Sequence, residues 1–148
     1  MNKKRSLFFL LLFLMPTFIF AEPNWAFWHK FELKKDEQAH IYVYDAKNEE
    51  IEAKIYTFSW TLFDTKQLIL HTRYRDFPKQ QVLTLERGKR ALKELLLEDK
   101  VDRLKSKTSL LLEFTQFNNE DKIATIEAFI EDRAKRVKIE FYDPRIKE

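Results

Sequence analysis

Apolar and polar residues alternate along most of the chain beyond residue 22, and this pattern limits the possible folds more than any other feature. Residues 137–142, for example, read VKIEFY, with Val137, Ile139 and Phe141 on one parity. Successive side chains of a β-strand point to opposite faces, so a period of two predicts strands with one buried face. We therefore expect an all-β protein.

Eight segments show this pattern, and short polar turns separate most of them. The last three should form an antiparallel meander, because each is joined to the next by only a few polar residues. No helical segment recurs between strands as a parallel sheet would require. We expect about eight strands in one antiparallel β-sandwich over residues 22–148, with a small β-barrel as the alternative. The segments are 27–33, 40–45, 51–63, 67–77, 80–86, 109–117, 122–132 and 137–143.

The alternation slips once, inside residues 51–63. Apolar residues occupy odd positions up to Ile55 and even positions from Tyr56 to Leu62. One strand cannot bury both sets on one face, so a bulge is expected near Ile55 and Tyr56, or a strand that passes from one sheet to the other.

Residues 89–104 are ambiguous between a helix and a strand. Leu92, Leu95, Leu96, Val101 and Leu104 fit helical spacing, and the residues around them have good helix propensity. The pattern favours one short helix near 89–104. An edge strand followed by a charged loop is the alternative.

The first 21 residues have the features of a secretory signal peptide. Lys3, Lys4 and Arg5 precede an uncharged run from Ser6 to Phe20, which is shorter than the roughly 20 apolar residues that cross a bilayer comfortably. We expect cleavage after Ala21, export to the periplasm and no stable membrane span afterwards. The alternative is an uncleaved segment that anchors the chain.

The charge balance gives no reason to expect a nucleic-acid partner. The chain has 27 Lys and Arg residues against 24 Asp and Glu, and three of those cations belong to the leader. The remaining chain is neutral apart from its histidines. The sequence pI of about 9.0 therefore reflects the leader rather than a basic binding surface.

Two scarce residue types exclude whole classes of chemistry. The chain has no cysteine, which excludes disulfides, thiolate metal sites, cysteine nucleophiles and lipid attachment at a cysteine. Its only glycine is Gly88, and phosphate-binding loops, dinucleotide folds and the G-x-S-x-G elbow of serine hydrolases all need more. No cofactor is expected.

The histidines and carboxylates do not form a recognisable catalytic or metal-binding pattern. His29, His40 and His71 lie in separate segments without the spacing of paired metal ligands. Carboxylates are abundant, but nothing in the sequence brings two of them together. We therefore predict no catalytic, cofactor-binding or metal-binding residues and a protein that is not an enzyme.

A basic row is the first candidate for a partner or ligand surface. Residues 71–75 read HTRYR and place His71, Arg73 and Arg75 on the polar face of one strand. Guanidinium groups bind carboxylate or phosphate oxygens with paired hydrogen bonds, so the row could hold an anionic ligand or partner. The alternative is cross-strand pairing with Glu or Asp.

Three aromatic residues form the second candidate. Trp28, Tyr42 and Tyr44 fall on the faces opposite the expected core residues of their strands. Aromatic rings exposed on a sheet can bind sugars, peptides or partner strands. The alternative is that they cover the other side of the sheet beneath a loop.

A broader resemblance rests on residue usage. The segments NWAFWHKFELKKDE, SWTLF and FYDPR, together with the leader and the abundance of Lys, Phe and Leu, resemble short exported proteins of Campylobacter- and Helicobacter-type bacteria. The resemblance spans most of the mature chain without a signature motif. It implies a Gram-negative periplasm and no particular activity.

Three functional hypotheses follow from these features. The first is a non-enzymatic periplasmic module that binds a protein or a cell-envelope component, by edge-strand addition or through a sheet face. The second is a carrier of a small apolar molecule inside a closed sheet, suggested by the 14 phenylalanines. The third is a hydrolase, which would need His29 or His71 beside a carboxylate in a cleft.

Overall fold

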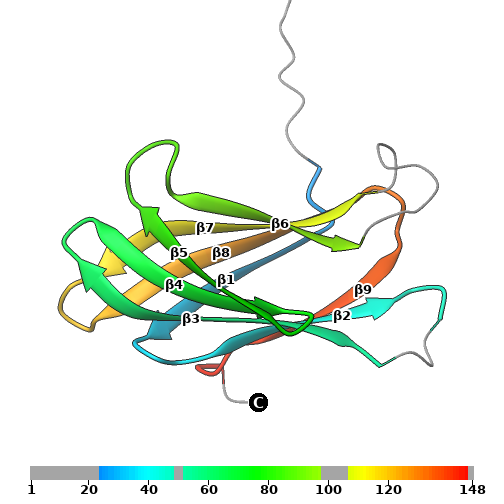
Figure 1. Ribbon diagram of the computed structural model, residues 1–148, viewed down its shortest axis with the longest axis horizontal. Coiled ribbons are helices and arrows are strands. Elements are labelled where there is room, and N and C mark those ends of the chain that lie inside the picture. The colour runs from blue at the N-terminus through cyan, green and yellow to red at the C-terminus, as the bar shows by residue number, and fades with distance from the viewer. Residues whose placement is uncertain (1–23, 49–51, 98–106, 147–148) are drawn as a thin grey trace, which may run out of the picture.

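The computed structural model describes residues 24–48, 52–97 and 107–146. The strands within these residues are β1 (Phe27–Lys34), β2 (Ala39–Asp45), β3 (Lys54–Asp64), β4 (Gln67–Tyr74), β5 (Phe77–Thr84), β6 (Ala91–Leu97), β7 (Thr108–Asn118), β8 (Ile123–Asp132) and β9 (Val137–Tyr142). They form a four-stranded sheet in the order β1-β8-β7-β6 and a five-stranded sheet in the order β5-β4-β3-β2-β9. Figure 1 shows both sheets running along the long axis of the molecule.

The predicted all-β sandwich is confirmed, with nine strands rather than about eight. All strand pairs are antiparallel, and the strands lie in two separate sheets, so the alternative of a small closed barrel is wrong. No helix long and apolar enough to cross a membrane lies within the described residues.

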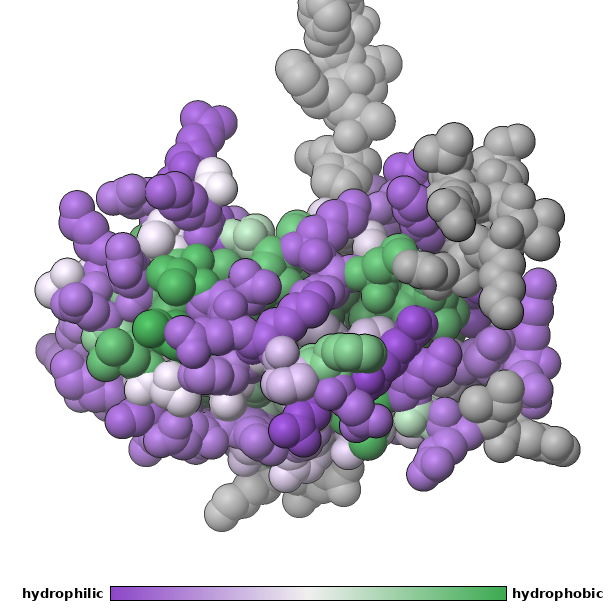
Figure 2. All heavy atoms as spheres, in the orientation of Figure 1, coloured by the Kyte–Doolittle hydropathy of each residue, from purple (hydrophilic) through white to green (hydrophobic). Residues whose placement is uncertain are grey.

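The core consists of the inward side chains of both sheets, as the period of two predicts. β8 shows the rule clearly, because Ala124, Ile126, Ala128 and Ile130 are all fully buried while the residues between them are partly exposed. Burying a side chain the size of isoleucine contributes about 1.5–3 kcal/mol relative to leaving it in water. Hydrophilic side chains dominate the surface in Figure 2, with hydrophobic ones in separate patches between them.

Two contacts tie β1 of one sheet to β3 of the other. The rings of Phe31 and Phe58 meet edge to face at 5.0 Å between centroids, and both side chains are buried. Trp60 donates its indole Nε1–H to the backbone oxygen of Leu33 at 2.8 Å. A buried indole needs such a partner, so this bond fixes the position of Trp60 between the sheets.

The predicted helix near 89–104 is wrong where the structure describes it. Residues 91–97 form β6, which pairs with β7 from Ala91 opposite Glu113 to Leu97 opposite Thr108. Pairing with β7 and burial of Leu96 against the core override the helix propensity of these residues. Residues 98–106 lie outside the described residues.

The predicted bulge near Ile55 and Tyr56 is also wrong. Ile55 simply faces outward at the start of β3, with Tyr56 inward, so no extra residue is needed there. The register shift lies between Trp60 and Leu62 instead, at Thr61. It turns Leu62 outward, although its parity with Trp60 predicted that it would face the core.

The turns contain almost no glycine. Gly88, between β5 and β6, has a φ of 92°. The other tight turns place residues with a Cβ in the left-handed region, which costs about 1–2 kcal/mol each relative to ordinary backbone. The β4–β5 hairpin has a two-residue loop with positive φ at both positions, as type I′ turns require. The residues with positive φ are Asp36, Thr65, Arg75, Asp76, Lys122 and Lys135.

Replacing Lys122 by glycine should therefore stabilise the protein. The φ of Lys122 is 55°, and glycine relieves this strain while adding about 0.5–1 kcal/mol of backbone entropy to the unfolded chain. We expect a net gain of about 0.5–1 kcal/mol in the free energy of unfolding, measured by urea denaturation. Lys35→Gly is the control, since Lys35 is a turn residue with negative φ and its substitution should destabilise. An equal decrease in the free energy of unfolding for both variants would contradict the claim that the backbone at Lys122 is strained.

Candidate functional site

The six residues predicted to form a partner surface do not lie together. Four of them, Tyr42, Tyr44, His71 and Arg73, point outward from the five-stranded sheet. We call this outward side the five-strand face. Trp28 lies on the outer side of the other sheet, and Arg75 lies in the β4–β5 turn. The structure therefore selects one face that unites members of the aromatic and basic groups.

The five-strand face is built by the register of its strands. One row crosses all five of them, because each residue in it is the direct partner of the next. The row carries an aromatic ring on β9, a histidine on β2, a hydroxyl on β3, a guanidinium on β4 and a proline on β5. Its members are Tyr142, His40, Thr57, Arg73 and Pro78.

Aromatic side chains occupy the β9 and β2 half of this face. The ring of His40 lies 5.3 Å from that of Tyr142 and 6.2 Å from that of Tyr42, between centroids. The Tyr44 hydroxyl donates to Glu140 at 2.9 Å, and this hydrogen bond raises the pKa of Tyr44 above its usual value. These rings form a contact surface with polar groups at its edge.

Polar and cationic side chains occupy the other half, over β3, β4 and β5. The hydroxyl of Thr61 and Nε2 of His71 are 3.0 Å apart. The direct partners of Arg73 are Thr57 and Pro78, neither of which is acidic. Arg73 is exposed and has no ion pair with a carboxylate among the described residues, so the alternative of cross-strand charge pairing does not apply to it.

Exposed apolar side chains also gather on this face. Ile55, Leu62, Val82 and Tyr142 are 43–54% exposed, and all four point outward from the five-stranded sheet. Leu62, Ile69 and Val82 are direct partners across β3, β4 and β5. The bulge at Thr61 places Leu62 there, which is why the alternation pattern missed it.

The hydrogen bond of Arg75 lies at the edge of the other sheet rather than on the five-strand face. Nη2 of Arg75 and the hydroxyl of Tyr74 both donate to the backbone oxygen of Leu96, each at 2.8 Å. Leu96 lies at a register shift in β6, where its oxygen is released from the ladder. Burial raises the pKa of Tyr74. The pair therefore joins the five-stranded sheet to the edge of the other sheet.

Trp28 lies on the opposite side of the sandwich and is 56% exposed. It is the direct partner of Phe129, which pairs in turn with Leu111, and its Nε1 donates to Glu127 at 3.1 Å. Trp25 precedes β1, and the centroid of its ring lies 5.2 Å from that of Phe129. These side chains form a second, smaller aromatic row.

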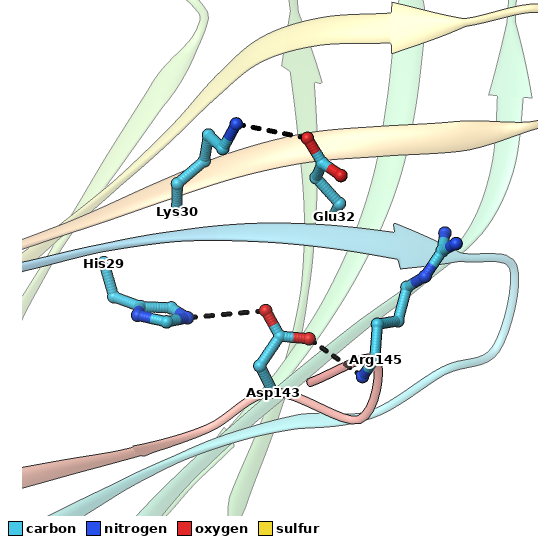
Figure 3. A network of polar contacts seen from close by, with 5 residues as sticks. All are labelled: His29, Lys30, Glu32, Asp143 and Arg145. Atoms are coloured by element: carbon cyan, nitrogen blue, oxygen red, sulfur yellow. Dashed lines mark hydrogen bonds and ion pairs between the residues drawn. The ribbon is translucent and has the colours of Figure 1, made fainter. Parts of the chain in front are cut away.

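The structure does bring one histidine to a carboxylate. Nε2 of His29 lies 3.4 Å from Oδ2 of Asp143, whose Oδ1 accepts the backbone N–H of Arg145 at 3.0 Å (Figure 3). The imidazole stacks on the ring of Phe141, with 5.0 Å between centroids, and meets the ring of Phe31 edge to face, with 4.4 Å between centroids. These contacts hold the end of β9 against β1, which is a structural role.

The hydrogen bonds of the described residues place no serine or threonine hydroxyl beside His29. The same part of the chain holds no cluster of three or more His, Asp or Glu side chains arranged to bind a metal ion. His40 and His71 are half-buried.

No protein-family model matches this chain, and comparisons with curated proteins and with solved structures find no similar protein. The functional assignment therefore depends on the geometry of the chain's own residues.

The position of His40 predicts a pH effect on stability. Burial lowers the pKa of His40 below its ordinary value near 6.5, so the unfolded chain takes up a proton there more readily than the folded chain. The free energy of unfolding should fall as the pH falls below about 6.5, and this contribution should be absent from His40→Gln. Urea midpoints measured for both proteins between about pH 7.5 and 5 would show the difference. Identical pH profiles would contradict it.

Proposed function

We propose that this chain is an exported, periplasmic, non-enzymatic binding module that docks a protein partner on its five-strand face. The observation that carries this proposal is the unbroken outward row across all five strands, flanked by half-exposed apolar side chains. The proposal includes no cofactor, metal or nucleic acid. The leader supports export, because a basic start followed by a short apolar run is what the secretion machinery recognises.

The size of the face suits a protein partner. Five strands about 4.8 Å apart and about eight residues long cover roughly 600 Å² in plan, and side-chain relief adds to the accessible area. A standard protein interface buries about 800 Å² on each partner. A protein would therefore cover most of the sheet, including both its aromatic and its cationic half.

The composition of the face also suits a protein. Interface cores are enriched in tyrosine and arginine and poor in acidic residues, with polar groups around them. Tyr42, Tyr142 and Arg73 lie within the face, and Glu140 lies on β9 at its edge. We therefore favour a protein over the broader class of cell-envelope components.

The other two hypotheses receive less support from the geometry. The carrier hypothesis relied on a closed sheet around a ligand, and the two sheets instead pack on each other through a filled core. For the hydrolase hypothesis, the described residues offer the half-buried His29 beside the buried Asp143, and both are engaged in contacts that join two strands.

Photo-crosslinking in the native cells tests the docking face. The photoreactive residue p-benzoylphenylalanine would replace Tyr42 or Tyr142 on the five-strand face, and Trp28 on the opposite side as the matched control. We expect one discrete protein adduct from positions 42 and 142 and none from 28. The captured protein should bind the purified chain, with about tenfold weaker affinity for Tyr142→Ala, because a tyrosine that becomes buried at an interface is often worth more than 1 kcal/mol.

Three results would overturn this proposal. The first is the absence of a discrete protein adduct from positions 42 and 142. The second is an adduct formed equally from Trp28, which would mean that neither face is selective. The third is a heterogeneous adduct digested by glycosidases, which would assign the face to a glycan.

A further inference from the structure

An open depression of about 520 Å³ lies on the cationic half of the five-strand face, over β3, β4 and β5. No acidic side chain is among the residues that line it. An anion in the depression would therefore meet no like charge in its walls. Its polar and charged lining residues are Gln38, Thr57, Ser59, His71, Thr72, Arg73, Lys79 and Gln80.

The register of the sheet places several of these side chains next to one another on the same face. Thr57 is the direct partner of Arg73, and Ser59 is the direct partner of His71 on the adjacent pair of positions. Gln80 is the partner of His71 on the other side. Side chains directly opposite on one face of a sheet have Cβ atoms about 4.5–5.5 Å apart. One small group can therefore reach a guanidinium and neighbouring hydroxyls together.

The depression has one uncompensated positive charge. Lys79 also lines it, but its Nζ lies 2.9 Å from both carboxylate oxygens of Glu94, so that charge is already neutralised. Arg73 has no ion-pair partner among the described residues. A guanidinium can donate two parallel hydrogen bonds to the two oxygens of a carboxylate.

We propose that this depression binds one carboxylate of an acidic segment in the protein partner, with Arg73 as the anchoring residue. Thr57 and Ser59 donate hydroxyl hydrogen bonds to the same group. One free cation balances one carboxylate, whereas a phosphate group carries close to two charges and would call for a second. The identity of the partner as a protein rests on the proposed function, but the carboxylate site is testable without it.

Arg75 provides a matched control for Arg73. It is two residues further along the chain and carries the same charge, yet its Nη2 donates to the backbone oxygen of Leu96 at the sheet edge. It does not line the depression. Arg75→Gln should therefore leave carboxylate binding unchanged.

Peptide titration followed by amide NMR tests the site on the purified mature chain. The probe is an extended octapeptide of alternating Thr and Glu, with a Thr–Gln peptide of the same length as its neutral counterpart. We expect saturable shifts at residues 57, 59, 71, 73 and 80, and about tenfold weaker binding of the neutral peptide. Arg73→Gln should weaken binding of the acidic peptide by about the same factor.

Four results would overturn the proposal: no saturable shift at millimolar peptide, shifts centred on another surface, equal binding of the two peptides, or equal effects of Arg73→Gln and Arg75→Gln. A phosphoserine peptide that binds about tenfold more tightly than the acidic one would reassign the site to phosphate.

The two proposals fail separately. Carboxylate binding at Arg73 without a crosslinked protein would remove the docking function and keep the site. The opposite result is a crosslinked partner whose affinity is unchanged by Arg73→Gln, together with no binding of the acidic peptide. This result would keep the docking function and remove the carboxylate site.

Discussion

The meshing of inward side chains between the two sheets holds this molecule together, and each surface feature depends on it. A sheet with one apolar face must bury that face against another layer. Here the edge-to-face contact of Phe31 and Phe58 and the bond from Trp60 to the Leu33 oxygen lock the layers together. Without cysteine, these noncovalent contacts carry the stability that disulfides supply in many exported domains.

The same constraint leaves the outward side chains of each sheet to form the surface of the molecule. On the four-stranded sheet, the exposed ring of Trp28 donates its N–H to Glu127 and belongs to a short aromatic row. On the five-stranded sheet, one row joins Tyr142 to Arg73 through His40 and Thr57, over a span of four strands. The second face combines rings, hydroxyls and an unpaired guanidinium, which gives it the greater range of contacts.

The sequence was sufficient to predict the sandwich because alternation reports the local geometry of each strand. It predicted the inward face of β9 and the outward positions of Tyr42, His71 and Arg73 correctly. The sequence pattern predicted the wrong secondary structure for β6. The strand there depends on pairing with β7, and a local pattern carries no information about the partner strand.

Bulges and turns were the second source of error. The shift at Thr61 reverses the direction of Leu62, and no residue type at that position signals it. Alternation also placed Arg73 and Arg75 in one row, but the strand ends at Tyr74 and the turn sends Arg75 toward Leu96. The five-strand face could be predicted in outline, whereas its limits depend on where strands end and where they bulge.

Hydroxyl-radical footprinting in the native envelope, compared with the purified chain, tests the docking of a partner on the five-strand face most directly. Radical oxidation of aromatic side chains reports their solvent exposure residue by residue, and both proteins can be read by mass spectrometry. We expect Tyr42 and Tyr142 to be protected in the envelope while Trp28 reacts equally in both. Protection of Trp28 with unchanged reactivity of the two tyrosines would contradict the assignment of the face.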